Sequence, residues 1–237
     1  MMSTSRIAVI LPVRKCSERV ANKMLRPFAG RSLYEICVEK LGWIAKAMSI
    51  NDHIDFFVGF HEPEFEAAAS KAGLGMLHRT KDDANAEGWP HLYGYLGDID
   101  HEWVCHMSAC LPMLAATSMF NFINAVNCAV NELDEDSGVV AVTKAAKYIW
   151  RNAVNEADRP VNLNPGCGNS KIMKPLFPCA NCMYAFRREN WFKEPHVYWP
   201  DKQPRLFVIE NEVEAFDVDT MAQFYAAERM YRGEYSK

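Results

Sequence analysis

The sequence of 237 residues contains neither of the two common glycine-rich phosphate-binding motifs. The P-loop pattern G-x-x-x-x-G-K-S/T is missing, and so is the dinucleotide fingerprint G-x-G-x-x-G. Any nucleotide bound by this chain must therefore be held by charged side chains, together with loop amides of another kind.

An excess of positive charge is also missing. The chain has 26 Lys and Arg against 30 Asp and Glu, which gives a formal net charge of −4. No global field is available to hold a nucleic-acid backbone or an anionic membrane, so the expected partners are small molecules. Apolar residues make up 49% and charged residues 24%, a composition that excludes a disordered chain. We expect one domain over residues 1–237.

Long hydrophobic runs are lacking as well. The apolar run at 7–13 follows Arg6 and is followed at once by Arg14 and Lys15, so it is too short and wrongly flanked for a signal peptide. No window approaches the roughly 20 apolar residues of a membrane helix. A cytoplasmic location is therefore expected, and the eight cysteines, spread over a core-forming chain, are expected to be mostly reduced.

The apolar residues alternate between strand-like and helix-like spacing along most of the chain. Ile7–Pro12 is β-branched and apolar throughout, as in a strand buried on both faces, and Ser32 with Glu35 forms a capping box for a helix reaching about Met48. Further strands are expected at 54–60, 76–78, 103–107, 138–142, 183–186 and 213–218, and further helices at 63–72, within 84–96, and at 117–133, 188–192 and 220–232. This alternation predicts a three-layer, Rossmann-like α/β fold with a mostly parallel sheet.

One stretch interrupts the alternation. Residues 144–178 are rich in Pro, Asn and Gly and contain only short extended pieces. We interpret this stretch as an inserted arm.

The loop after the first strand carries a local cluster of cations. In open α/β sheets ligands bind at the carboxyl ends of the strands, so this loop is the first candidate for a binding site. It contains five cations against the single acid Glu18 in a chain that is acidic overall, namely Arg14, Lys15, Arg19, Lys23 and Arg26. The cluster suits a polyphosphate, although charge alone is equally compatible with a solvated loop.

A pair of carboxylates lies near the other end of the chain. Asp217 and Asp219 are two apart on an expected strand, so both should project from one face while Val218 points into the core. Two carboxylates suit Mg²⁺, which completes its octahedron with water and substrate phosphate. The alternative is that Asp219 caps the last helix and Asp217 is a strand-end charge.

These two segments resemble one known family. The string LPVRKCSERVANKMLRPFAGRSLYE resembles the signature loop of the CMP-sugar synthetases, the acylneuraminate cytidylyltransferase family, and FDVDT with the later AER is similar to that family's closing segment. Arg79, Pro112 and the stretch from Asn181 match further family positions between them. The resemblance implies a nucleotide-diphospho-sugar transferase fold, with residues 144–178 as a homodimerisation arm.

The resemblance also implies an activity and roles for individual residues. The reaction would transfer CMP from CTP to an acidic sugar such as a nonulosonic acid, with Mg²⁺ as cofactor and release of pyrophosphate. The residues carried over are Arg14 and Lys23 on the phosphates as catalytic residues, Ser17 beside them, Arg79 facing the cytosine, Asn181 on the acceptor, and Asp217 and Asp219 on the metal.

Several positions depart from the family pattern. Lys15 and Cys16 stand at the family's Gly pair in the loop, Glu18 at its following Lys and Met24 at an Asn, and residues 109–112 read A-C-L-P where the family has P-T-S-P. A Cβ at position 16 opposes close approach of a phosphate to the backbone. The acceptor could therefore be a 3-deoxy-octulosonic acid or a phosphonate, or the chain could be a catalytically silent nucleotide-binding homologue. The choice of CTP over UTP or ATP depends on the resemblance alone.

Other side chains offer weaker alternatives. Cys179 and Cys182, with Cys167 and His196, have part of a zinc-ligand spacing, and C-x-x-C is also a redox pattern. His106 is interpreted as a satisfied histidine rather than as a base. A further alternative is a nucleophilic role for Cys16, which lies beside two cations in the sequence.

Overall fold

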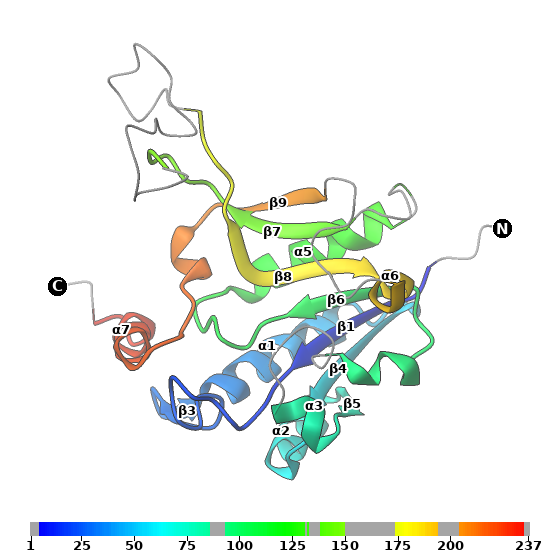
Figure 1. The fold of residues 1–237 in the computed structure, drawn as a ribbon, viewed down its shortest axis with the longest axis horizontal. Coiled ribbons are helices and arrows are strands. Elements are labelled where there is room, and N and C mark those ends of the chain that lie inside the picture. Colours follow the sequence, from blue (N-terminus) through cyan, green and yellow to red (C-terminus); the bar gives the residue numbers. More distant parts are fainter. Residues whose placement is uncertain are drawn as a thin grey trace.

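The structure is a computed structural model that describes residues 5–85, 93–130, 132, 138–149, 174–193 and 204–234. A seven-stranded sheet forms its centre, in the order β5-β4-β1-β6-β8-β7-β9 (Figure 1). The strands are β1 (Ile7–Pro12), β4 (Ile54–Phe60), β5 (Gly75–His78), β6 (Trp103–Met107), β7 (Val139–Thr143), β8 (Cys179–Arg187) and β9 (Arg205–Ile209). A two-stranded hairpin is made by β2 (Pro27–Phe28) and β3 (Arg31–Ser32).

The sheet is parallel except at β8. β1 pairs in parallel with β4 and β6, whereas β8 runs antiparallel to both of its neighbours, β6 and β7. The first residues of β8 consequently lie at the same edge as the last residues of β1, β5 and β6. This edge is where a ligand is expected in an α/β sheet.

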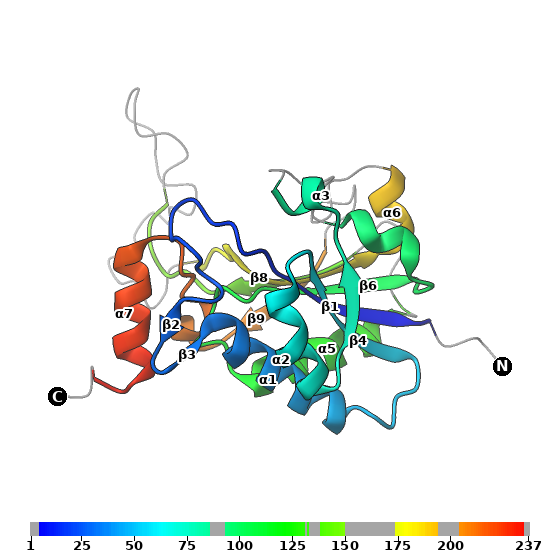
Figure 2. The same ribbon diagram turned by 90° about the horizontal axis from the view of Figure 1, so that it is seen from below.

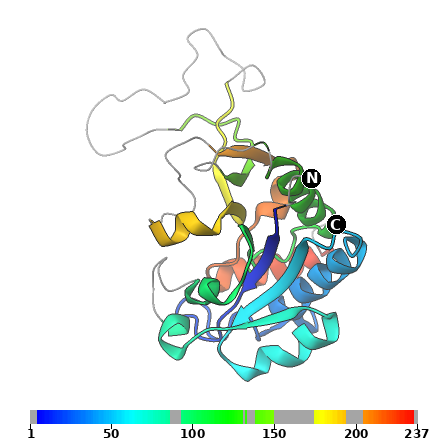
Figure 3. The ribbon, with the colours of Figure 1, turned by 90° about the vertical axis from the view of Figure 1, so that its right-hand side faces the viewer.

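Helices cover both faces of the sheet (Figures 2 and 3). One layer contains α1 (Leu33–Ala47), α2 (Glu66–Ala72) and α5 (Ala116–Ala129), and the opposite layer contains α3 (Lys81–Asn85), η2 (Gly94–Asp98) and α6 (Arg188–Lys193). α7 (Met221–Tyr231) stands at one end, beside the β2–β3 hairpin. The alternating residues of β1 serve the two layers: Ile7, Val9 and Leu11 pack in one hydrophobic cluster, and Ala8 and Ile10 in the other.

Most of the expected elements are confirmed. Ser32 and Glu35 make both hydrogen bonds of a capping box at the start of α1, and Thr220 with Gln223 makes another at α7. The expected helix within 84–96 is described only at its two ends, as α3 and η2. The arm at 144–178 is described only at 144–149 and 174–178, where Ala145 and Leu176 form one antiparallel bridge, so the expected arm lies largely outside the described residues.

The expected strand at 213–218 is wrong. The chain forms a 3₁₀ helix there, η4 (Glu212–Ala215), and then continues without regular structure to Thr220. The Asn211 side chain accepts a hydrogen bond from the Val213 amide and so starts the turn. The sheet position next to β7 is taken instead by β9, which was not predicted from the sequence because it is a short edge strand with two of its five residues, Arg205 and Leu206, exposed.

Two further expectations concern the described residues. No helix among them is long and apolar enough to cross a membrane. The seven described cysteines are free thiols, and the reduced state stays an expectation.

Candidate functional site

A cleft of about 730 Å³ lies at the edge of the sheet where β1, β5 and β6 end and β8 begins. This volume is within the range of small-molecule sites. The cleft brings together every residue that the sequence analysis assigned to the site: it is lined by Arg14, Ser17, Lys23, Arg79, Asn181, Asp217 and Asp219. These residues come from positions more than 200 apart in the chain.

The loop after β1 is fixed at both ends by backbone contacts. The Val13 amide donates to the Gly59 carbonyl on β4 at 2.8 Å, and the Tyr34 amide at the start of α1 donates to the Met24 carbonyl at 3.1 Å. Val20 and Met24 are buried beneath the loop. The apolar residues of the loop therefore anchor it to the core and leave its polar residues at the surface.

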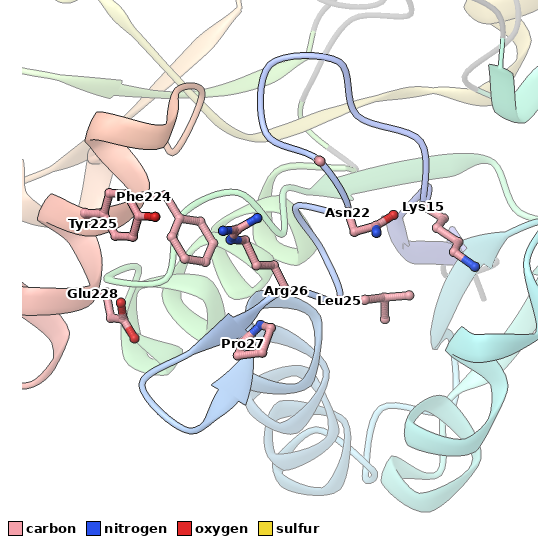
Figure 4. A pocket seen from close by; sticks show the side chains of 9 residues that line it. Lys15, Asn22, Leu25, Arg26, Pro27, Phe224, Tyr225 and Glu228 are labelled. Carbon is pink, nitrogen blue, oxygen red and sulfur yellow. The ribbon is translucent and has the colours of Figure 1, made fainter.

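The five loop cations divide into two groups. Arg14, Arg19 and Lys23 line the cleft. Lys15 is ion-paired with Glu64 outside it, and the guanidinium carbon of Arg26 lies 5.8 Å from the ring centre of Phe224 on α7. Lys15 and Arg26 line a second pocket, of about 480 Å³, which lies beside α7 and is shown in Figure 4. Only part of the charge cluster read from the sequence therefore faces the cleft.

Lys23 and Arg19 connect the loop to the C-terminal carboxylates. Lys23 Nζ donates to the Val218 carbonyl at 2.8 Å and lies 3.5 Å from Asp219 Oδ1, while Arg19 Nη2 lies 2.9 Å from the same oxygen. The Lys23 side chain is 11% exposed and the Arg19 side chain 67%. The contacts of Lys23 are thus sheltered from solvent, whereas the contact between Arg19 and Asp219 is a surface ion pair that is easily exchanged.

Asp217 and Asp219 face the cleft together although no strand holds them. Val218 between them is fully buried, as predicted, and its amide donates to the Cys110 carbonyl at 3.0 Å. This bond and the Lys23 bond fix the backbone so that both carboxylates reach the cleft. The cap of α7 is Thr220, so the alternative interpretation of Asp219 as the helix cap is wrong.

The surroundings of Asp217 suit a cation. Its Oδ1 is buried and has no hydrogen-bond partner in the described part of the chain. Burial raises the pKa of the Asp217 carboxyl, and the neighbouring charge of Asp219 raises it further. Two adjacent carboxylates, one with an orphaned oxygen, match the one or two protein ligands that Mg²⁺ takes.

Arg79 lies deeper in the cleft than the loop cations. It follows β5 and is 6% exposed. Its Nη1 donates to the Val13 carbonyl at 3.4 Å and its Nη2 to the Asp83 carbonyl at 2.6 Å. Burial lowers the pKa of its guanidinium, but an arginine stays charged in a protein. Arg79 therefore joins the start of the loop to α3 and adds a fixed positive charge to the cleft.

The wall opposite the loop is formed by β6 and β8. Asn181 stands on β8 with φ of 50° and its Oδ1 accepts a hydrogen bond of 2.9 Å from the Tyr184 hydroxyl. This bond occupies the oxygen of the Asn181 side chain and directs its amide nitrogen elsewhere. Tyr184 and Cys179 were not assigned to the site from the sequence, because only the antiparallel pairing of β8 with β6 places them there.

The positions that depart from the family pattern also line the cleft. Cys16 is exposed on the loop, while Met24 and Ala109 are buried. Burial raises the pKa of the Cys110 thiol, and Lys23 acts in the opposite sense. Within the described residues no group of three or more His, Cys, Asp or Glu side chains is placed to hold a metal, and Cys167 and His196 of the weaker zinc alternative lie outside them.

No protein-family model matches the sequence, and a comparison with curated proteins found no match. Solved structures are similar in fold. A CMP:2-keto-3-deoxy-manno-octonic acid synthetase complexed with CTP superposes with a TM-score of 0.65 at 14% identity, over 97% of this chain and 100% of that one. A 4-diphosphocytidyl-2C-methyl-D-erythritol synthase from Anaerococcus prevotii DSM 20548 gives 0.62 at 10% identity, over 97% and 100%. This chain therefore has the Rossmann-like nucleotide-diphospho-sugar transferase fold that the resemblance implied.

Proposed function

We propose that this chain is a CTP-dependent cytidylyltransferase, which transfers CMP from CTP to an acidic acceptor and releases pyrophosphate. The observation that carries the proposal is the convergence of three loop cations, Arg79 and two aspartates on one cleft, at the ligand-binding edge of a fold shared with a synthetase solved in complex with CTP. In the reaction an oxygen of the acceptor forms a bond to the α-phosphorus while the bond from that phosphorus to the bridging oxygen of pyrophosphate breaks.

The loop cations would act on the phosphates. Arg14 and Lys23 are the proposed catalytic residues, because the transition state carries charge on the phosphoryl oxygens and on the leaving pyrophosphate. Ser17 would donate a hydrogen bond to a phosphate oxygen beside them. Arg79, fixed by the Val13 and Asp83 carbonyls, would face the base.

Asp217 and Asp219 would hold Mg²⁺. A metal ion bound there supplies neutralisation of the triphosphate and acidifies the attacking hydroxyl. The orphaned oxygen of Asp217 supports this role. Asp219 would exchange its ion pairs with Arg19 and Lys23 for the metal, which leaves both cations available to phosphate.

The acceptor would lie against β8, where Asn181 is the proposed contact. We infer a nonulosonic acid such as a sialic acid, with a 3-deoxy-octulosonic acid or a phosphonate as alternatives. A cytoplasmic homodimer is part of the same proposal, with residues 144–178 as the dimerisation arm.

A pyrophosphate-release assay tests the proposal. Purified protein is incubated with Mg²⁺ and CTP, UTP or ATP, and with N-acetylneuraminic acid, 3-deoxy-manno-octulosonic acid or a phosphonate. Release that needs CTP, Mg²⁺ and one acid supports the proposal, and the Asp217→Asn variant should abolish it. Binding of CTP without release for any acid would favour the silent homologue instead.

A further inference from the structure

A buried histidine lies in the wall of the cleft that faces the basic loop. His106 is on β6, paired in register with Ile10 of β1 and Tyr184 of β8. It is 8% exposed and still lines the cleft. A polar side chain buried to this extent requires a partner for each of its polar atoms, or a ligand that supplies one.

Of the two ring nitrogens of His106, one is hydrogen-bonded to a residue that the structure describes and the other is not. Nδ1 is hydrogen-bonded to the hydroxyl of Tyr93, which is fully buried. Nε2 makes no hydrogen bond within the described part of the chain, yet it is not among the fully enclosed polar atoms that lack a partner. Nε2 therefore keeps access to the cleft.

The Tyr93 contact fixes how Nε2 can act. If Tyr93 donates to Nδ1, Nε2 carries the proton and donates, and if Nδ1 donates to Tyr93, Nε2 accepts. Aromatic neighbours hold the ring in place, with ring centres at 5.8 Å for Tyr93 and 5.6 Å for Tyr184. In either state a single, oriented hydrogen-bonding atom is presented to the cleft.

The imidazole is uncharged. Burial lowers the pKa of His106 to about 3, and no described carboxylate is hydrogen-bonded to it. The described residues of the wall around it are also uncharged, namely Ser108, Cys179, Asn181 and Tyr184. The charges of the cleft come from the loop, Arg79 and the two aspartates. The β6–β8 wall is thus suited to hydroxyl and amide groups and not to a carboxylate.

We propose that His106 Nε2, oriented by Tyr93, hydrogen-bonds an uncharged hydroxyl or amide group of the acceptor and that His106 is a specificity-determining residue of the β6–β8 wall. This inference rests on the proposed cytidylyltransferase function and adds to it a statement about the acceptor: its acid group lies toward the cations, and its hydroxylated part lies against β6 and β8.

The binding of CMP and of CMP-sugars separates the two halves of the cleft. Dissociation constants are measured by calorimetry for CMP, CMP-N-acetylneuraminate and CMP-3-deoxy-manno-octulosonate, with the wild type and with His106→Phe and His106→Gln. The CMP part is common to all three ligands. The dissociation constant of CMP divided by that of a CMP-sugar therefore measures only the contacts made by the sugar.

We expect a wild-type ratio above one for at least one CMP-sugar. His106→Phe should lower that ratio roughly 3- to 10-fold, as for one neutral hydrogen bond, without changing the CMP constant. In His106→Gln the ratio of dissociation constants should stay close to the wild-type value, because the glutamine amide can also form a hydrogen bond. Thermal unfolding and CMP binding show that each variant is folded.

The positioning role of Tyr93 has a spectroscopic test. In ¹⁵N NMR spectra the wild-type His106 ring should show one neutral tautomer, and Tyr93→Phe should show a mixture. A mixture of tautomers already present in the wild type would contradict the role of Tyr93.

Three outcomes are distinguishable. A ratio that His106→Phe leaves unchanged, or a wild-type ratio of one for both CMP-sugars, would overturn the inference and leave the proposed function standing. Failure of the wild type to bind CMP or CTP at all would overturn the proposed function, and the inference with it.

Discussion

The Lys23 ammonium donates a hydrogen bond of 2.8 Å to the Val218 carbonyl, between the two aspartates of the cleft. The bond joins residues 195 positions apart. The same ammonium lies 3.5 Å from Asp219 Oδ1, so a loop cation, proposed to bind phosphate, and a carboxylate, proposed to bind the metal, are held next to each other.

Replacing Lys23 by Met should remove a phosphate contact and leave the shape of the loop largely intact. Losing one charged donor to a transition state corresponds to about 2–4 kcal/mol, so kcat/KM for CTP should fall roughly 30- to 800-fold. Steady-state kinetics and calorimetric titration with CTP measure the effect. An unaltered dissociation constant for CTP would remove Lys23 from the phosphate site.

The different surroundings of two neighbouring arginines offer a matched pair. Arg19 lines the cleft and pairs with Asp219, while Arg26 lies in the adjoining pocket beside Phe224 (Figure 4). We expect Arg19→Gln to weaken CTP binding about 3- to 10-fold, as for one exposed charged contact. Arg26→Gln removes the same charge from the same loop and should change the affinity less than twofold. Equal losses in both variants would indicate a general effect of charge and not a contact made by Arg19.

Asp217 should oppose folding when no metal is bound. Its pKa is raised in the folded state, mainly by burial, so the folded protein holds a proton more tightly than the unfolded chain and loses stability as pH rises through the raised value. Asp217→Asn should therefore raise the Tm of the ligand-free protein at pH 7.5, by about 2–4 °C for each kcal/mol gained.

The pH dependence and the ligand response check this explanation of Asp217. The difference in Tm between Asp217→Asn and wild type should shrink as the pH is lowered toward about 4, where the ordinary carboxyl is protonated in the unfolded chain as well. Stabilisation by Mg²⁺ with CTP should be lost in the variant. A lower Tm for Asp217→Asn at pH 7.5 would mean that the carboxylate is paired and stabilising.

His106 should make the protein sensitive to mild acid. Its pKa is lowered to about 3 in the folded state, whereas an ordinary imidazole titrates near about 6.5. At a pH between these two pKa values the unfolded chain binds a proton that the folded protein does not. The free energy of unfolding is therefore highest above about pH 6.5 and decreases as the pH falls below it. His106→Gln should flatten this slope in urea unfolding at pH 7.5, 6.0 and 5.0.

A control for the His106 slope is available on β5. The matched control is His78→Gln, which removes an exposed imidazole instead of a buried one. If His106→Gln and wild type lose stability in parallel over this range, the imidazole is not held neutral by burial.

The sequence predicted the strands that are buried on both faces more accurately than the edge of the sheet. The bounds of β1, β4 and β6 are confirmed, because runs of apolar residues leave few alternatives. β9 was missed and the strand at 213–218 was wrong, because an edge strand and a 3₁₀ turn can have the same mixture of apolar and charged residues. The pattern of apolar and polar residues within a segment does not determine which segment pairs with β7.

The residues named from the sequence line one cleft, but which of the loop cations face it could not be predicted. The string around Arg14 and Lys23 and the D-x-D at Asp217 pointed to the cleft. The sequence did not show that Lys15 and Arg26 turn away from it. Nor did it show that Nε2 of His106 has no hydrogen-bond partner among the described residues, because that depends on the antiparallel pairing of β8 and on a hydroxyl 13 positions away.

The most direct test of the central claim is thermal unfolding of the purified protein with each of the four nucleoside triphosphates, with and without Mg²⁺. A ligand at about 100 times its dissociation constant adds roughly 2.7 kcal/mol to stability, which raises the midpoint visibly. We predict a shift with CTP that exceeds the shift with UTP, ATP or GTP and that grows when Mg²⁺ is added. A cooperative transition that none of the four nucleotides moves would contradict the account.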